Sequence, residues 1–265
     1  RAIELQPNDA YNYNVRGIIY RYLSDYKRAM EDYNRAIELK PDEADPYVGR
    51  AITYRVLGQF SKSIEDYTTA IQLQPNNGDH YYWRGQTYRT INNLPAALDD
   101  LGRAIELQPG DPANYNERGI IYRKLSQYEP AIEDYSRAIE LRPEYADPYV
   151  GRALAYDGLE QYQAALADYS RVLELRPKEA DTYLGRAFTY RKIQDYDAAL
   201  ADLTTAVELQ PENDTFYFWR GRIYQDMERY EDAVAEFDRA VELKPGYGYN
   251  YQSRGVNFSH LKDYE

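Results

Sequence analysis

Apolar and small residues recur along the chain at helical spacing, in pairs of short segments separated by polar turns. The stretch from residue 114 to residue 143, NYNERGIIYRKLSQYEPAIEDYSRAIELRP, shows one such pair. Its first segment carries Tyr115, Gly119, Tyr122 and Leu125 at spacings of three and four residues, which place them on one face of a helix. The second segment keeps the same rhythm, and neither segment shows the period-two alternation of a strand. The pattern predicts two amphipathic helices joined by a tight turn and closed by a proline.

This two-helix unit returns every 34 residues along the whole chain. Residues 1–9 form the end of a preceding second helix, and residues 248–265 form a partial repeat. No linker or low-complexity tract interrupts the pattern, so we expect a single array over residues 1–265. Counted from Ala10, the seven full repeats are 10–43, 44–77, 78–111, 112–145, 146–179, 180–213 and 214–247.

A few positions of the repeat carry the same kind of residue in every copy. Position 4 is tyrosine in all eight first helices, position 8 is glycine or alanine, and position 11 is aromatic. Positions 20 and 27 are small, and position 32 is proline in every full repeat. A small residue at position 8 lets the second helix approach closely, and proline at position 32 ends the second helix. Twenty-five of the 31 tyrosines lie at positions 4, 11, 17 and 24, so we interpret most tyrosines as packing residues.

These anchors, with an aromatic residue at 4, a small one at 8, Tyr at 11, Ala at 20 and 27 and Pro at 32, resemble the tetratricopeptide repeat. The resemblance covers the whole chain. It implies an all-α fold, a right-handed superhelical solenoid of antiparallel helix pairs whose first helices line a concave groove. It also implies a protein that binds peptides, protein tails or other domains. The Lys and Asn residues by which some relatives clamp a terminal carboxylate are not reproduced here.

Arginine occupies position 7 of all eight first helices, and an acidic residue occupies position 23 of all seven second helices. On a helical wheel, position 7 shares an arc with positions 4, 8 and 11, which face the second helices. An unpaired guanidinium there would be costly to remove from water. We therefore expect arginine–carboxylate pairs that link helices within or between repeats.

A second arginine column lies at position 12, on the arc that the resemblance assigns to the concave wall together with positions 2, 5, 9 and 13. On a chain of net charge −12, this column favours an anionic partner. The alternative is that these arginines pair with neighbouring acidic residues, such as Asp45, Asp79, Asp147 and Asp181 at position 2. The predicted partner-binding residues on this wall are Asn14, Arg21, Arg55, Tyr82, Arg89, Asn116, Arg123, Lys124, Arg191 and Phe218.

Composition excludes several other functions. The negative net charge argues against a nucleic-acid binder. The sequence contains no run of 18 apolar residues, so it predicts no membrane span. Cysteine is absent, which excludes thiol chemistry and favours a reducing compartment such as the cytoplasm. The two histidines are far apart, and neither a catalytic triad nor metal-ligand spacing nor a phosphate-binding loop is present. We therefore expect no enzyme activity, no cofactor and no metal.

The leading hypothesis is a scaffold that grips an extended protein segment, acidic and apolar in character, in its groove. A second hypothesis is a structural module that associates end to end through the uncapped faces at residues 1–9 and 248–265, because solenoids need polar caps for solubility. A third is a regulatory region of a larger protein. The motif ADPYVGRA at residues 44–51 recurs at 146–153, three repeats later, and either duplication or a periodic ligand would explain this.

Overall fold

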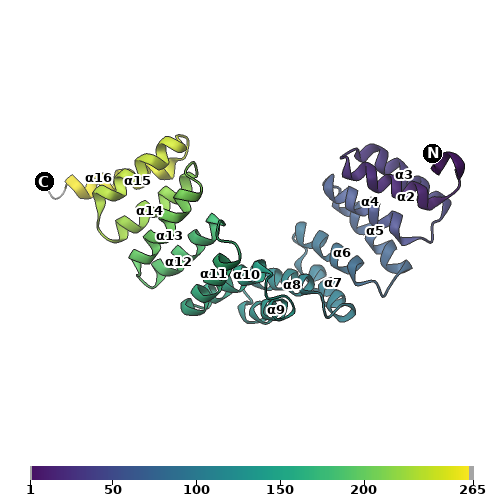
Figure 1. Cartoon of the computed structure of the whole chain (residues 1–265), viewed down its shortest axis with the longest axis horizontal. Coiled ribbons are helices and arrows are strands. Elements are labelled where there is room, and N and C mark those ends of the chain that lie inside the picture. Colours follow the sequence, from purple (N-terminus) through teal and green to yellow (C-terminus); the bar gives the residue numbers. More distant parts are fainter. Residues whose placement is uncertain (1, 263–265) are drawn as a thin grey trace. The chain divides into compact units, whose positions relative to one another are not determined.

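Helices are the only regular elements in the computed structural model, which describes residues 2–262 (Figure 1). After a short α1 (Ala2–Leu5), first and second helices of the repeat alternate along the chain. The first helices are α2 (Ala10–Tyr22), α4 (Ala44–Val56), α6 (Gly78–Thr90), α8 (Pro112–Lys124), α10 (Ala146–Gly158), α12 (Ala180–Lys192), α14 (Asp214–Asp226) and α16 (Gly248–Lys262). The second helices are α3 (Tyr26–Leu39), α5 (Phe60–Leu73), α7 (Leu94–Leu107), α9 (Tyr128–Leu141), α11 (Tyr162–Leu175), α13 (Tyr196–Leu209) and α15 (Tyr230–Leu243).

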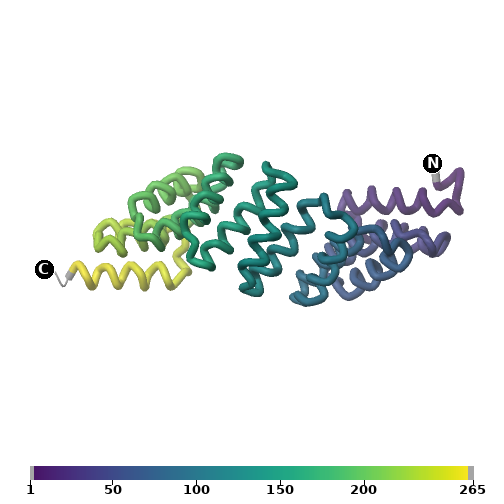
Figure 2. The backbone as a smooth tube through the Cα atoms, turned by 90° about the horizontal axis from the view of Figure 1, so that it is seen from below, coloured from purple at the N-terminus to yellow at the C-terminus, as the bar shows by residue number. Residues whose placement is uncertain are grey.

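The contacts between helices divide the chain into two compact units, residues 1–127 (unit 1, α1 to α8) and residues 128–265 (unit 2, α9 to α16). Within each unit, every first helix of a complete pair packs against its own second helix, and the second helix packs against the next first helix. Figure 2 shows the chain of each unit running back and forth from helix to helix. The all-α fold of stacked helix pairs is confirmed in both units. That residues 1–265 form one uninterrupted array stays a prediction.

The turn between the two helices of a repeat has a left-handed residue at position 15. Gly58 fills this position in the second repeat, with a φ of 72°. In the other full repeats the residue has a side chain, and its φ lies between 57° and 62°. A left-handed backbone costs such residues about 1–2 kcal/mol. The six strained residues are Ser24, Asn92, Ser126, Glu160, Gln194 and Glu228.

Tyrosines link neighbouring repeats in two ways. The position 4 hydroxyl donates a hydrogen bond to the carbonyl of the preceding position 32 proline, as from Tyr47 to Pro41 at 3.2 Å. The position 24 tyrosine is fully buried between two helices, and Tyr33 shows why glycine is needed beside it. A Cβ added to Gly17 would lie 2.8 Å from the Tyr33 ring, and one added to Gly49 of the next repeat would lie 2.5 Å from it. The small residue at position 8 therefore packs as predicted, and position 6 adds a second close approach between repeats.

The arginines at position 7 join three helices. Arg50 of α4 donates from Nε and Nη2 to the two carboxylate oxygens of Asp66 on α5, at 2.8 and 2.7 Å. Its Nη1 donates to Asn34 of the preceding second helix at 2.7 Å. The predicted arginine–carboxylate pairs are thus confirmed within repeats whose two helices lie in one unit, whereas the contact of Arg50 with the preceding repeat is to an amide. The same contact with position 23 recurs in Arg16–Asp32, Arg84–Asp100, Arg152–Asp168, Arg186–Asp202 and Arg220–Glu236.

Candidate functional site

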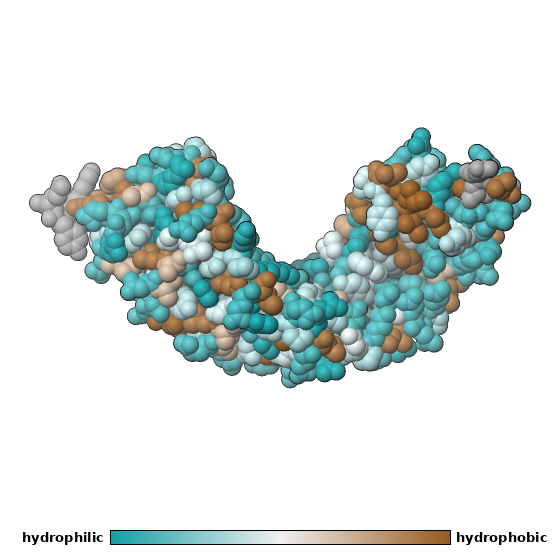
Figure 3. Space-filling view, viewed as in Figure 1, coloured by the Kyte–Doolittle hydropathy of each residue, from teal (hydrophilic) through white to brown (hydrophobic). Residues whose placement is uncertain are grey.

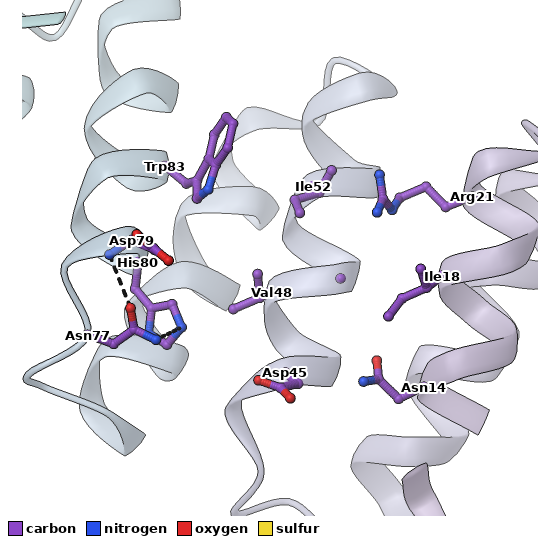
Figure 4. Close-up of a pocket in the computed structure, with 11 residues that line it drawn as sticks. Asn14, Ile18, Arg21, Asp45, Val48, Ile52, Asn77, Asp79, His80 and Trp83 are labelled. Atoms are coloured by element: carbon purple, nitrogen blue, oxygen red, sulfur yellow. Dashed lines mark hydrogen bonds between the residues drawn. The ribbon is translucent and has the colours of Figure 1, made fainter. Parts of the chain in front are cut away.

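A groove of about 310 Å³ lies across the first helices α2, α4 and α6 of unit 1 (Figure 4). Its middle is apolar and is made by Ile18 of α2 with Val48 and Ile52 of α4. Gly49 also lines it, and the glycine must stay small because the Tyr33 ring lies directly behind it. The groove thus depends on the packing between repeats, since a larger residue at 49 would displace the helices that form its walls.

Two groups at one end of the groove lack hydrogen-bond partners. Asn14 is only 7% exposed, and its Oδ1 has no partner within residues 2–262. Its amide points from α2 into the groove, in front of Asp45 (Figure 4). Arg21, also on α2, has a buried Nε without a partner in the same range, and its guanidinium lies 4.7 Å from the Tyr22 ring centroid. An unmet acceptor and an unmet donor therefore lie on the same wall.

The edge of the groove at which Asn14 lies carries two carboxylates at the starts of helices. Asp45 begins α4 and Asp79 begins α6, and Asn77 caps α6 by accepting a hydrogen bond from the Asp79 amide at 3.1 Å. Asp79 also accepts a hydrogen bond from Gln108 Nε2 at 2.9 Å. Beside them, burial lowers the pKa of His80, although both carboxylates act to raise it. The ring is therefore neutral at neutral pH, and this edge keeps a negative charge.

Arg55 and Tyr82 join one polar chain at the side of the groove. Arg55 Nη1 donates to Gln86 Oε1 at 3.0 Å, and Gln86 Nε2 donates to the Tyr82 hydroxyl at 2.7 Å. The Arg55 guanidinium also lies 4.8 Å from the ring centroid of Trp83, which lines the groove. Neither Arg55 nor Arg21 forms an ion pair in the part of the chain that the structure describes. Their charges remain available to a ligand.

Other arginines of the position 12 column already have acidic partners. Arg89 Nε lies 3.1 Å from Glu117 Oε2 on α8, and the carboxylate is more buried than the guanidinium. Burial raises the pKa of Glu117, and Arg89 offsets part of that shift. In unit 2, Arg191 forms a close bidentate pair with Asp226 on α14. Two of the five arginines are therefore neutralised, although by Glu117 and Asp226 and not by the aspartates at position 2.

The remaining predicted residues lie outside the unit 1 groove. On α8, Asn116 is buried, Arg123 has a buried Nε without a partner among residues 2–262, and Lys124 donates to Asn92 at 2.7 Å. Phe218 of unit 2 lines a smaller pocket of about 190 Å³ with Trp219. The structure therefore brings Asn14 and Arg21 into one site, with Arg55 and Tyr82 beside it. It does not bring all ten predicted residues together.

Sequence reasoning missed part of this site. Asn77 and His80 line the groove, yet neither is among the residues that the sequence pattern predicts to bind a partner. A usable signal was present, because position 3 is polar in several repeats and is buried in the structure, as at His80 and Asn114. At position 6, Glu117 departs from the glycine or tryptophan found in five of the other repeats. Such departures mark where a repeat acquires its own contacts.

Among the described residues, no helix is long and apolar enough to cross a membrane. No group of three His, Asp or Glu side chains within residues 2–262 is placed to hold a metal ion. The visible surface of each unit is mostly hydrophilic, with hydrophobic patches among the hydrophilic residues (Figure 3).

Comparison with known protein families gives matches along most of the chain. A family described as TPR repeat matches residues 53–91 and 119–159. Three families described as tetratricopeptide repeat match residues 184–248, residues 10–43, and residues 80–111 with 146–179. A search of curated proteins gave no match.

Several solved structures share the fold. A tetratricopeptide repeat protein from Parabacteroides merdae has a TM-score of 0.70 at 18% identity, over 94% of this chain and 98% of that one. The Cut9–Hcn1 structure of the APC/C has a TM-score of 0.67 at 21% identity over 83% of this chain. The match spans only 44% of that longer chain. YrrB, titled a TPR protein with an unusual peptide-binding site, has a TM-score of 0.58 at 23% identity, over 68% of this chain and 92% of that one.

Proposed function

The chain belongs to the tetratricopeptide repeat family, and we propose that it is a scaffold that binds an extended segment of a partner protein in the groove of unit 1. Repeats of this family form protein-interaction scaffolds, and YrrB is described as having a peptide-binding site. The proposed partner segment is acidic and apolar, and no chemical step is required of the scaffold.

The observation that carries the proposal is the unmet Asn14 Oδ1 together with the unmet Arg21 Nε two turns further along α2. A buried polar group without a partner costs about 1–3 kcal/mol, and a ligand that supplies the partner recovers that cost. A peptide backbone supplies N–H donors for Asn14, and its carbonyls or acidic side chains accept from Arg21. The apolar floor at Ile18, Val48 and Ile52 then takes one or two apolar side chains.

The acidic character of the partner rests on Arg21 and Arg55. Arg21 lines the groove, and Arg55 lies beside it over the ring of Trp83; neither has a carboxylate within ion-pair distance among the described residues. A carboxylate that binds a half-buried guanidinium in a groove with apolar walls forms charge-assisted hydrogen bonds, which are stronger than neutral ones. The paired Arg89 and Arg191 contribute less, since a ligand would first have to displace Glu117 or Asp226.

A display library of nine-residue peptides tests the function. Peptides selected on the whole chain would be resynthesised and their affinities measured by fluorescence polarisation. We expect Ile52→Glu, which places a charge on the groove floor, to abolish binding. The matched control Arg103→Gln, on the exposed side of α7, should bind as tightly as the unchanged protein. Peptides that bind Ile52→Glu with undiminished affinity would remove the groove from the proposal.

A second candidate function is end-to-end self-association. Leu5, Tyr11 and Tyr22 are between 65% and 77% exposed around α1 and α2, and Tyr249 is 63% exposed on α16. Light scattering over a hundredfold range of concentration should then show the mass rising above that of one chain. A constant mass of 31.0 kDa would exclude this function.

A further inference from the structure

Charges of opposite sign lie along the two edges of the unit 1 groove (Figure 4). Arg21 lies in the last turn of α2 and Arg55 in the last turn of α4. Asp45 and Asp79 lie in the first turns of α4 and α6. The arginine and aspartate positions are ten residues apart in the repeat, which corresponds to about 15 Å along a helix axis. Side chains of a ligand lying between the two edges can reach both.

Helix dipoles account for part of this arrangement. Acidic residues stabilise helix N-termini and basic residues stabilise C-termini, whether or not a ligand binds. Asn14 is not explained in this way. Its Oδ1 is buried in the groove wall without a partner among residues 2–262, and this indicates a ligand that brings a donor between the two charged edges.

We propose that the partner segment carries both signs of charge, with an acidic side chain on the arginine edge and a basic side chain on the aspartate edge. This rests on the proposed function and names the chemistry of its ligand. The segment runs extended across α2, α4 and α6, and its backbone N–H bonds Asn14. Apolar side chains next to the charged ones contact Ile18, Val48 and Ile52.

An extended chain determines the spacing of these charges. Successive side chains of a strand point to opposite sides. The acidic and basic residues must therefore be an odd number of positions apart to face opposite edges. A segment whose charges all have one sign places some of them against an edge of the same sign. The repulsion lowers its affinity, so the groove discriminates against such a segment.

Nine-residue peptides of one composition, Glu and Lys among Val, Leu and Ser, test this spacing against the whole chain. We expect peptides with Glu and Lys one or three positions apart to bind about tenfold more tightly than peptides with the same residues two or four apart, a difference of about 1.4 kcal/mol. Variants with Lys replaced by Glu should also bind about tenfold more weakly. Equal affinity at odd and even spacings would overturn the proposal.

Thermodynamic cycles assign each edge. Asp45→Asn should weaken binding of the Glu–Lys peptide but leave the version with Gln in place of Lys unchanged. Arg21→Gln should likewise weaken binding of the Glu–Lys peptide but leave binding of the version with Gln in place of Glu unchanged. Asp99→Asn and Arg103→Gln, on the exposed side of α7, serve as charge-matched controls. Binding that needs Arg21 but not Asp45 overturns the mixed-charge ligand and leaves the proposed function standing. If Ile52→Glu leaves the affinity for the peptide unchanged, both the mixed-charge ligand and the proposed function are refuted.

Discussion

The position 7 arginines and the position 23 carboxylates form a series of ion pairs along the repeats, here called the arginine ladder. Removing one of its carboxylates tests what holds the repeats together. Asp66 is the strongest site for this test, since its side chain is 8% exposed and accepts two hydrogen bonds from Arg50 at 2.7 and 2.8 Å. Arg50 is 19% exposed and also bonds Asn34 of the preceding helix. The hydrogen bonds to Asp66 raise the pKa of Arg50, which therefore stays charged at every working pH. Asp66→Asn consequently leaves a charged guanidinium without its counter-ion.

The magnitude follows from the burial of the pair. Breaking a fully buried ion pair from one side costs about 3–5 kcal/mol. Arg50 is partly exposed and keeps its bond to Asn34, and the asparagine of the variant retains one acceptor oxygen. We therefore expect Asp66→Asn to lower the free energy of unfolding by about 1–3 kcal/mol. A cycle with Arg50→Gln should show a coupling energy of the same size.

Urea unfolding measures this effect. Trp83 lies in unit 1 and Trp219 in unit 2, so a Trp219→Phe background makes fluorescence report unit 1, which contains Asp66. Arg35→Gln breaks an exposed pair with Glu38 on α3 and should cause no measurable change. A coupling energy below about 0.5 kcal/mol would refute the idea that the ladder stabilises the stack, and would leave it as a determinant of register.

Three further predictions concern stability. Burial raises the pKa of Asp157 in the folded protein above its value in the unfolded chain, so folding favours the protonated carboxyl. This group therefore contributes stability at a pH below its pKa in the unfolded chain, and that contribution is lost as the pH rises through its pKa in the folded protein. Asp157→Asn should therefore raise the melting temperature at pH 7, and the gain should vanish below about pH 4. A gain that persists in acid would contradict this origin. Gly49→Ala should lower the free energy of unfolding in urea by about 1–3 kcal/mol, because the added Cβ meets the buried Tyr33 ring. Gly102→Ala, with open space around the added Cβ, should raise the free energy of unfolding by about 0.5–1 kcal/mol. Gln194→Gly, at a φ of 62°, should raise the melting temperature, since glycine relieves left-handed strain; an unchanged or lower value would show that the turn is not strained.

The positions of the helices could be predicted from the sequence because each helix is represented by several copies, which together define helix ends that one copy leaves uncertain. A single amphipathic segment predicts helix ends poorly, but seven copies of one period place each proline and each small residue at the same point. The first helices accordingly begin at position 1 and end at position 13 in seven repeats. The partner of each position 7 arginine could also be anticipated, since a charge facing a second helix has few choices.

The groove was only partly predictable. Its wall positions came from the family resemblance, and of the predicted residues Asn14 and Arg21 line the unit 1 groove. What the pattern could not show is which arginines are already paired. Arg89 and Arg191 carry the same repeat position as Arg21, yet they contact Glu117 and Asp226. Those carboxylates lie 28 and 35 residues further along the chain, and no spacing rule connects them.

The sequence by itself determined the repeat, the helices and the packing between them, because these depend on contacts that recur with the same period. Tyr47 bonding Pro41 and Arg50 bonding Asp66 have counterparts in nearly every repeat. Only the tertiary structure decided where charge is left unpaired. Whether a guanidinium is free depends on side chains that differ from repeat to repeat and meet only when neighbouring helices stack. Asn14 Oδ1 and Arg21 Nε have no partner within residues 2–262, and this makes their wall of unit 1 the candidate binding surface.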